Sequence, residues 1–366
     1  MKVGILSMQR IKNYGSFLQA YGLKSILEEL GADVEFVDYH PGKTLVPSDE
    51  GKGIIRKISK LLDVVKISAP LQEKIKFINY KKNYEKNYFP YLGITSKKNY
   101  SPNLDLLVIG SDEVFNCVQS NTNVGFAPEL FGQGNNAKKL ITYAASFGNT
   151  SIKKLKDYSV DEKIANYLQN FDAISTRDEN SSTIVKELTG LDVEKNLDPV
   201  LIYNFIDSGM IPKLVEKEKY LLLYGYSGRF TREECNLIRL YTKKMGLKVY
   251  CIGGLQECCD KFIDCDPFKV IAYFKNAEVV VTDTFHGTIM SIITHKRFAS
   301  IIRENGYGNS QKLSDLLKRL NLLSRKLNNW EELEELLSRD IDYTNTDRII
   351  LEEKIKTYNY LNDWIN

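Results

Sequence analysis

The sequence of 366 residues lacks the long apolar runs of membrane-spanning and secreted proteins. No stretch stays apolar for the roughly 20 residues that a membrane-spanning helix requires. The short apolar run from Met1 to Ser7 passes directly into polar Gln9 and Arg10, without the longer apolar region and cleavage site of a secretion signal. We therefore expect a cytoplasmic protein, and we interpret the first residues as a β-strand.

A strong charge of one sign and closely spaced cysteine pairs are missing too. Lys and Arg number 50 against 47 Asp and Glu, and the net charge of +3 is too balanced for a general nucleic-acid-binding protein. The six cysteines include no C-x-x-C pair, and adjacent Cys258 and Cys259 are a poor start for a tetrahedral zinc site. We expect reduced thiols and no metal; ligation of a metal by Cys258, Cys259 and Cys265 is the alternative.

The start of the chain also lacks the G-x-G-x-x-G loop of dinucleotide-binding proteins. A strand expected over 2–7, an amphipathic helix over 17–30 and a second strand over 33–39 form a βαβ unit, which implies a parallel sheet. The loop between strand and helix carries Asn13 and Ser16 instead of the glycine pattern. A classical dinucleotide site is therefore not supported.

Strands and helices alternate along the rest of the chain, which is long enough for two domains. We expect an N-terminal α/β lobe over 1–206, a linker over 207–219, a C-terminal α/β lobe over 220–344 and a closing helix over 345–366. Later strands are expected at 104–109, 140–144, 173–175, 220–224, 248–252, 279–281 and 298–302. The fold class is α/β, with two Rossmann-like lobes facing each other across a cleft.

A Lys-rich insertion over about 42–102 interrupts the N-terminal lobe. Its apolar residues at helical spacing are Ile54, Ile58, Leu61, Leu62 and Val65, and the basic residues around them are Arg56, Lys57, Lys60 and Lys66. Two interpretations stay open: a solvated helix pair that covers the sheet, or a basic amphipathic surface that rests on anionic lipid headgroups. The second would place the protein at the inner face of the membrane.

The stretch from Ala277 to Ser291 is the best candidate for a reactive site. An apolar β-branched run at 279–281 meets Thr282-Asp283-Thr284, and Phe285-His286-Gly287 then opens a segment with helical spacing. This order of a strand, a tight loop and a helix would place His286 near free backbone N–H groups at the edge of a parallel sheet, where α/β proteins hold ligands.

Four loops at expected strand ends carry a set of polar residues: Asn13 to Tyr21 (NYGSFLQAY), Gly110 to Asn116 (GSDEVFN), Ile174 to Asp178 (ISTRD) and Thr282 to Thr288 (TDTFHGT). In this order and at these separations, together with Tyr143 to Gly148 and Leu197 to Pro199, they resemble the polysaccharide pyruvyl transferase family over about residues 3 to 305. The resemblance implies a glycosyltransferase-B-like (GT-B-like) pair of lobes, with the acceptor on the N-terminal lobe and the donor on the C-terminal lobe.

The same resemblance implies a reaction. The pyruvyl group of phosphoenolpyruvate is transferred to a sugar of a cell-surface polysaccharide, or of its lipid-linked precursor, with a ketal as product and phosphate as leaving group. Phosphoenolpyruvate is then the donor substrate, and no cofactor is expected. A proton must reach the methylene carbon so that the adjacent carbon accepts a hydroxyl, which requires a general acid and cationic anchors.

His286 is the expected general acid, because it matches the histidine of the family's motif. The positive end of a helix disfavours a charged imidazole, so Asp283 or the dianionic substrate would have to offset this effect. Thr284, Gly287 and Thr288 would bind the substrate beside it. Helix capping or packing in the cleft is the alternative role of His286.

Cations are expected to hold the donor. Arg177 matches the family's arginine in the S-x-R-D-like loop, where it would grip a phosphate or carboxylate bidentately; an ion pair with Asp178 or Glu179 is the alternative. A second cation is expected from the group that follows the histidine helix: Lys296, Arg297 and Arg303. Among these we favour Arg303, because it follows the C-terminal end of a strand.

Polar residues of the N-terminal lobe are expected on the acceptor side. Asn13 and Ser16 would bind an anion or sugar hydroxyls at a helix start, or simply cap that helix. Asp112 and Asn116 resemble acceptor-side residues, and Asp112 would take the proton of a sugar hydroxyl; a turn carboxylate is the alternative.

Two other functions compete with pyruvyl transfer. One is a nucleotide-sugar-dependent glycosyltransferase of polysaccharide biosynthesis, because one fold can support several functions. The sequence favours pyruvyl transfer over it, since no acidic ribose-binding residue stands out after His286. The other is a non-catalytic carbohydrate-binding protein, in which His286 would be replaceable.

Overall fold

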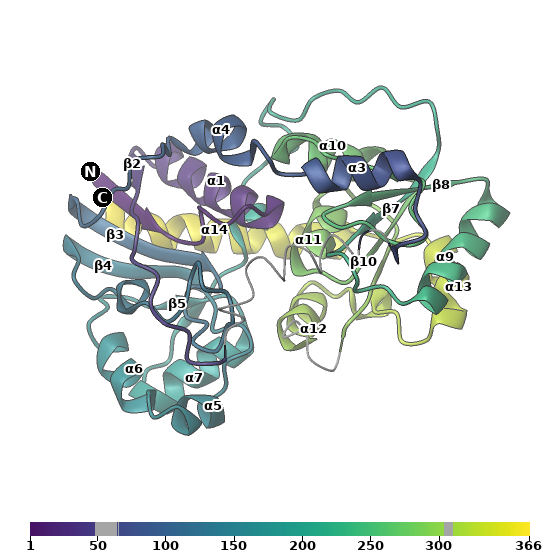
Figure 1. Ribbon diagram of the computed structural model, residues 1–366. Helices are drawn as coiled ribbons and strands as arrows, with labels where there is room; N and C mark the ends of the chain where they lie inside the picture. Colours follow the sequence, from purple (N-terminus) through teal and green to yellow (C-terminus); the bar gives the residue numbers. More distant parts are fainter. Residues whose placement is uncertain (48–63, 65, 304–309) are drawn as a thin grey trace.

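The computed structural model describes residues 1–47, 64, 66–303 and 310–366, which form two α/β lobes (Figure 1). Each lobe is built on one sheet in which every strand pair is parallel. This confirms the expected fold class of two Rossmann-like lobes. The amphipathic pattern expected from Ile54 to Val65 lies outside the described residues.

The N-terminal sheet has the strand order β2-β1-β3-β4-β5-β6. Its strands are β1 (Lys2–Leu6), β2 (Asp33–Phe36), β3 (Asn103–Asp112), β4 (Asn136–Ala145), β5 (Ser175–Thr176) and β6 (Glu194–Lys195). Leu106 to Ile109 in the middle of β3 are fully buried, as expected for a parallel sheet covered on both faces. The helices that follow these strands are α1 (Tyr14–Glu29), α4 (Tyr84–Tyr88), α5 (Ile152–Asp157), α6 (Asp161–Leu168), α7 (Glu179–Thr189) and α8 (Pro199–Ile202), with the short 3-10 helices η1 (Phe89–Leu92) and η2 (Pro128–Phe131).

The C-terminal sheet has the strand order β11-β10-β7-β8-β9. Its strands are β7 (Tyr220–Tyr224), β8 (Lys248–Ile252), β9 (Lys261–Phe262), β10 (Val279–Thr282) and β11 (Phe298–Ser300). Its helices are α9 (Arg232–Met245), α10 (Pro267–Asn276), α11 (Phe285–Ile293), α12 (Ser310–Arg319) and α13 (Leu333–Ser338), with η3 (Leu323–Arg325) and η4 (Trp330–Glu332). Helix α3 (Leu71–Asn79), from the insertion, lies against β9.

The two lobes share one hydrophobic cluster. Within it, the ring of Phe268 in α10 packs edge-on against Phe17 and Tyr21 of α1, at centroid distances of 5.7 and 4.9 Å. These contacts join the two lobes, because apolar side chains from both sides exclude water where they meet.

The last helix, α14 (Thr344–Ile365), returns to the N-terminal lobe, so that both chain ends lie close together (Figure 1). The hydroxyl of Tyr360 donates to the carbonyl oxygen of Thr142 in β4 at 2.8 Å. Buried Thr357 contacts Tyr143 and Asn196 through its hydroxyl. Among the described residues, no helix combines the length and the apolar character needed to cross a membrane.

Candidate active site

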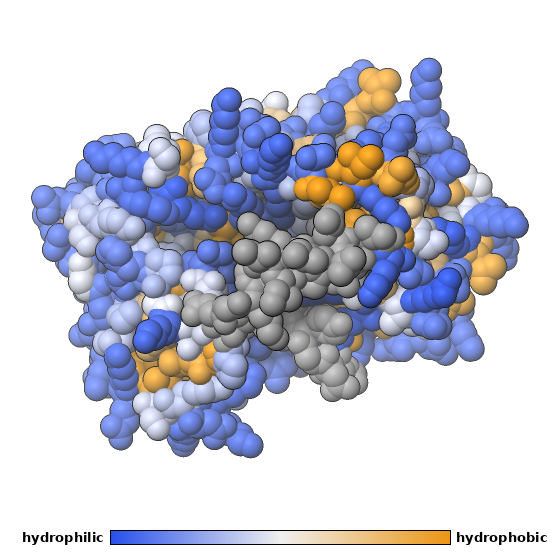
Figure 2. Space-filling view, in the orientation of Figure 1, coloured by the Kyte–Doolittle hydropathy of each residue, from blue (hydrophilic) through white to orange (hydrophobic). Residues whose placement is uncertain are grey.

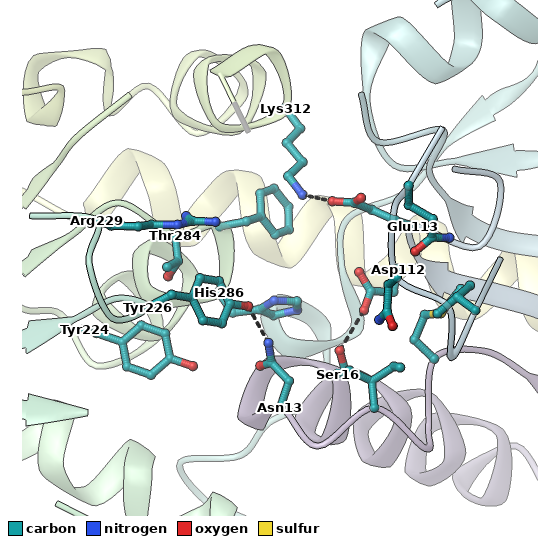
Figure 3. A pocket seen from close by; sticks show the side chains of 16 residues that line it. Asn13, Ser16, Asp112, Glu113, Tyr224, Tyr226, Arg229, Thr284, His286 and Lys312 are labelled. Carbon is teal, nitrogen blue, oxygen red and sulfur yellow. Dashed lines mark hydrogen bonds and ion pairs between the residues drawn. The ribbon is translucent and has the colours of Figure 1, made fainter. Parts of the chain in front are cut away.

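A cavity of about 300 Å³ lies between the lobes, where strands of both sheets end (Figure 3). The N-terminal lobe contributes Met8, Ile11, Asn13, Ser16, Asp112, Glu113, Gln119, Asn121 and Val124. The C-terminal lobe contributes Tyr224, Tyr226, Arg229, Thr284, Phe285, His286 and Lys312. This position agrees with the expectation that a ligand site forms at the carboxyl edge of parallel sheets.

The start of α11 places His286 in this cavity. Thr284, with extended backbone at φ −118°, caps the helix by accepting a hydrogen bond from the N–H of Gly287 at 2.9 Å. His286 follows in the first helical turn, and 14% of its side chain is exposed. The strand, loop and helix expected here are confirmed.

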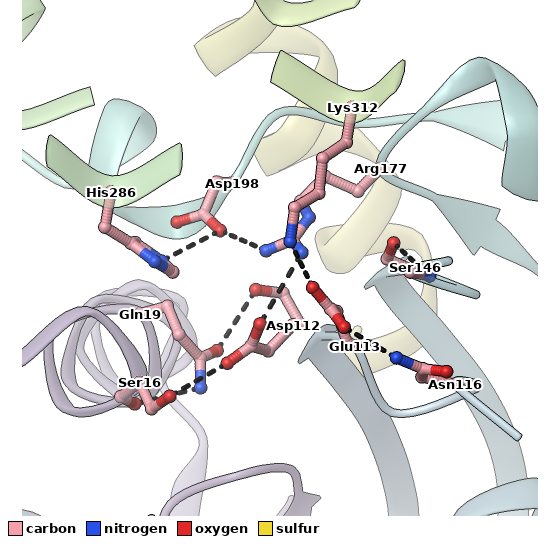
Figure 4. Close-up of polar contacts among 12 residues, drawn as sticks. Ser16, Gln19, Asp112, Glu113, Asn116, Ser146, Arg177, Asp198, His286 and Lys312 are labelled. Atoms are coloured by element: carbon pink, nitrogen blue, oxygen red, sulfur yellow. Dashed lines mark hydrogen bonds and ion pairs between the residues drawn. The ribbon is translucent and has the colours of Figure 1, made fainter. Parts of the chain in front are cut away.

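The carboxylate of Asp198 lies beside the imidazole of His286 (Figure 4). Its Oδ2 is 3.5 Å from Nε2 of His286 and 2.8 Å from Nη1 of Arg177. Burial alone would raise the pKa of Asp198, but His286, Arg177 and the backbone N–H of Val200 outweigh that effect and lower it to about 2. An ionised carboxylate therefore lies against the imidazole of His286.

Asp283 does not provide that carboxylate, contrary to the expectation from sequence. Its Oδ2 is 3.6 Å from Nη1 of Arg229 and 3.5 Å from Nε of Arg303. Burial raises the pKa of Asp283 even though both arginines oppose the shift. Asp283 precedes the helix that carries His286, but its side chain is held by these two cations.

Arg177 is buried next to the cavity and is not among the residues that line it. Its Nη1 donates to Asp198 at 2.8 Å, its Nη2 is 3.5 Å from Oδ1 of Asp112, and its guanidinium lies 4.5 Å from the ring centre of Phe285. The expected alternative partner Asp178 instead caps α7. Arg177 thus connects the carboxylates beside His286 and at the end of β3.

Asp112 is the last residue of β3 and lines the cavity from the N-terminal lobe. Its Oδ2 accepts a hydrogen bond from Oγ of Ser16 at 3.0 Å. Its φ of 78° is uncommon for a residue other than glycine, and such backbone strain often occurs at functional sites. Ser16 therefore holds this carboxylate and does not act as the helix cap.

Asn13 both caps α1 and reaches across the cleft. Its Oδ1 accepts from the N–H of Gly15 at 2.8 Å, and its amide donates to the hydroxyl of Tyr226 in the other lobe. Capping and cavity lining, which were alternatives for this loop, are combined in one side chain.

Two cations that the sequence reasoning did not select line the cavity. Arg229, in the loop after β7, lies 4.6 Å from the ring centre of Tyr226. Lys312 of α12 forms an ion pair with Glu113 of the N-terminal lobe. Burial would raise the pKa of Glu113, but Lys312 and its other polar neighbours lower it to about 2.

A model of the polysaccharide pyruvyl transferase family matches residues 13–305 of this sequence. The chain belongs to the polysaccharide pyruvyl transferase family. The resemblance seen in the four loops is thereby confirmed, and membership of this family indicates a transferase that acts on polysaccharide. Among curated proteins, none matches this chain.

Solved structures with a similar overall fold include an O-GlcNAc transferase mutant from Thermobaculum terrenum, with a TM-score of 0.44 and 10% identity. The match covers 100% of this chain and 66% of the transferase. A UDP-GlcNAc 2-epimerase from Neisseria meningitidis (TM-score 0.42, 11% identity) is covered over 100% of its length by 97% of this chain. The glycosyltransferase SnogD from Streptomyces nogalater (TM-score 0.43, 10% identity) is covered over 98% of its length by the whole chain. These similarities concern architecture alone.

Besides Arg177, four residues expected to bind substrate in this member of the pyruvyl transferase family do not line the cavity: Asn116, Gly287, Thr288 and Arg303. Asn116 bonds to Glu113 and Thr150, and the Thr288 hydroxyl bonds to the backbone of Thr284 and to Ser300. These side chains support the loops from behind.

Gly287 and Arg303 are also engaged elsewhere. A Cβ atom on Gly287 would overlap Thr282 and Thr284, so glycine permits the tight turn. Arg303 forms a bidentate ion pair with Glu234 of α9, at 2.5 and 2.9 Å. In the part of the chain that the structure describes, no cluster of three or more His, Cys, Asp or Glu side chains could hold a metal ion, and all six cysteines are free and buried.

Asp198, Glu113, Arg229 and Lys312 were not predicted from the sequence as site residues. Asp198 had a visible signal, because it stands before Pro199 in a segment that already supported the family resemblance. Glu113 stands next to Asp112 in one of the four loops. Arg229 and Lys312 have no such signal, since no spacing relates them to His286.

Proposed function

We propose that the protein transfers the pyruvyl group of phosphoenolpyruvate to a sugar of a cell-surface polysaccharide or of its lipid-linked precursor. The observation that carries this proposal is that His286 and Asp112, from opposite lobes, line one cavity together with the cations Arg229 and Lys312. Acid, base and anion-binding groups are what ketal formation from an enol phosphate requires.

In the proposed reaction, His286 gives a proton to the methylene carbon of phosphoenolpyruvate. The adjacent carbon then accepts the oxygen of a first sugar hydroxyl, whose proton goes to Asp112. The bond from that carbon to the phosphate oxygen breaks, and phosphate leaves with the proton that Asp112 took up. A second hydroxyl of the same sugar then adds to the carbon and gives its proton to His286, which restores both residues. The products are the ketal and inorganic phosphate.

Charged side chains lie next to both the proposed acid, His286, and the proposed base, Asp112. The carboxylate of Asp198 lies 3.5 Å from Nε2 of His286, the proposed proton donor. Nη2 of Arg177 lies 3.5 Å from Oδ1 of Asp112, the proposed proton acceptor. Arg229 and Lys312 supply positive charge from the lobe expected to bind the donor.

The test is phosphate release from phosphoenolpyruvate in the presence of glycan precursors from the producing cell, with mass spectrometry to detect a carboxyethylidene gain. We expect His286→Asn and Asp112→Asn to lower the rate by about 10² to 10⁴, the usual contribution of a general acid or base. The matched control is His295→Asn, because His295 is half exposed and lies outside the cavity, where it pairs with Asp347 and stacks on Tyr343.

A different result would favour the competing function. If nucleotide sugars raise the melting temperature and phosphoenolpyruvate does not, the protein binds a nucleotide-sugar donor and the proposal is wrong. If the His286→Asn variant keeps full activity, the assignment of the acid is wrong.

A further inference from the structure

Helix α3 is fixed to the C-terminal lobe by one of its two sides. The rings of Phe77 and Tyr80 pack edge-on against Phe262 of β9, at 5.2 and 5.3 Å. Oε2 of Glu73 accepts a hydrogen bond from the N–H of Phe262 at 2.7 Å. These contacts leave the opposite side of the helix without a role in the packing of this lobe.

That opposite side carries an exposed apolar stripe, formed by Leu71, Ile75 and Ile78. Their exposed fractions are 73%, 52% and 52%. Because a helix turns by about 100° per residue, these three positions share one narrow arc opposite Glu73 and Phe77. Figure 2 shows the corresponding hydrophobic patch over α3, with hydrophilic residues around it.

The chain around the stripe is strongly basic. Residues 66–86 contain six lysines and two glutamates, a charge of +4, although the whole chain carries only +3. Lys66, Lys82 and Lys86 are exposed. The charge of this segment thus exceeds that of the whole chain, and the same segment carries the exposed apolar side chains.

We propose that α3 and the lysines around it bind a membrane surface that carries anionic phospholipid headgroups. An apolar stripe that enters the boundary between headgroups and acyl chains, with lysines at headgroup level, is typical of peripheral membrane helices. A second copy of the chain fits this face poorly, because a symmetric contact would bring two +4 surfaces together. This inference does not depend on the identity of the donor substrate.

The test is co-sedimentation of the full chain with vesicles of equimolar phosphatidylcholine and phosphatidylglycerol, compared with vesicles of phosphatidylcholine alone. We expect binding to the anionic vesicles that weakens as salt is raised. The Leu71→Ser, Ile75→Ser, Ile78→Ser triple variant should bind at least about ten-fold more weakly. Lys82→Gln with Lys86→Gln should weaken binding by about five-fold for each lysine near the surface.

The matched control is Leu351→Ser with Ile355→Ser, because these residues form another exposed apolar pair, on α14, with exposed fractions of 59% and 57%. This control should bind like the unmodified protein, and unchanged melting temperatures would show that all variants fold. The proposal is overturned if the unmodified protein does not bind anionic vesicles, or if the control loses as much binding as the triple variant. It is also overturned if light scattering shows a dimer that the triple variant abolishes.

Discussion

Gly15 lies directly against the imidazole of His286, so the two lobes touch at the centre of the site. A Cβ atom on Gly15 would overlap Nδ1 and Cγ of the ring. Gly15 stands in the first turn of α1, where its N–H bonds to Asn13. The missing side chain therefore lets a helix of one lobe approach the proposed proton donor of the other.

Gly15→Ala should lower the rate of phosphate release by about 10², because a displacement of a reacting group by about 1 Å has an effect of this size. The melting temperature should change little, since alanine is otherwise favoured over glycine in a helix. The rate and a thermal melt are measured together. Ser25→Ala, further along the same helix, is the control and should keep full activity. If Gly15→Ala is as active as the unmodified protein, the position of the His286 ring is not critical.

If phosphoenolpyruvate is the donor, as proposed, Arg229→Ala should remove most of the thermal stabilisation that it gives, because the arginine lines the cavity and carries a planar guanidinium suited to anions. Arg232→Ala is a matched control, since Arg232 lies three residues later and its side chain is 75% exposed. The measurement is the shift in melting temperature with increasing ligand. Equal shifts for both variants would exclude Arg229 as a donor-binding residue.

The local pattern around His286 could be predicted from the sequence because the signals lie next to one another. The β-branched run, the capping Thr284 and the apolar helical spacing all concern neighbouring residues, and they give β10 and α11. The polar start of β4 at Asn136 was not predicted, because it shows no apolar pattern and is ordered by pairing with β3.

The partners of the charged residues could not be predicted, because they come from distant parts of the chain. Arg303 does follow a strand end as expected, but Glu234 of α9 holds it in a bidentate pair. Asp198 reaches His286 only because α8 lies between the lobes. Local spacing shows which residues stand at the cleft, whereas tertiary packing decides which of them face the cavity.

Arg177→Ala should destabilise the fold as well as reduce activity. Removing the guanidinium leaves Asp198 buried with one partner fewer, and breaking such a buried pair costs about 3–5 kcal/mol. The free energy of unfolding is measured by chemical denaturation. Arg348→Ala is the control, because its ion pair with Glu352 is 61% exposed on both sides and should contribute less than about 1 kcal/mol; equal losses would contradict this account.

Acid should destabilise the protein through Asp198. Its pKa is lowered from 3.8 to about 2 in the folded state, so its stabilising effect is complete above the ordinary pKa and is lost as the pH falls toward 2. The loss is on the order of 2 kcal/mol. Chemical denaturation near neutral pH and at about pH 3 should therefore show that the stability gap between the unmodified protein and Asp198→Asn narrows in acid. Asp340→Asn, at a carboxylate that is 96% exposed, should show no such convergence; a gap for Asp198→Asn that stays constant with pH would mean that the charge of Asp198 does not stabilise the fold.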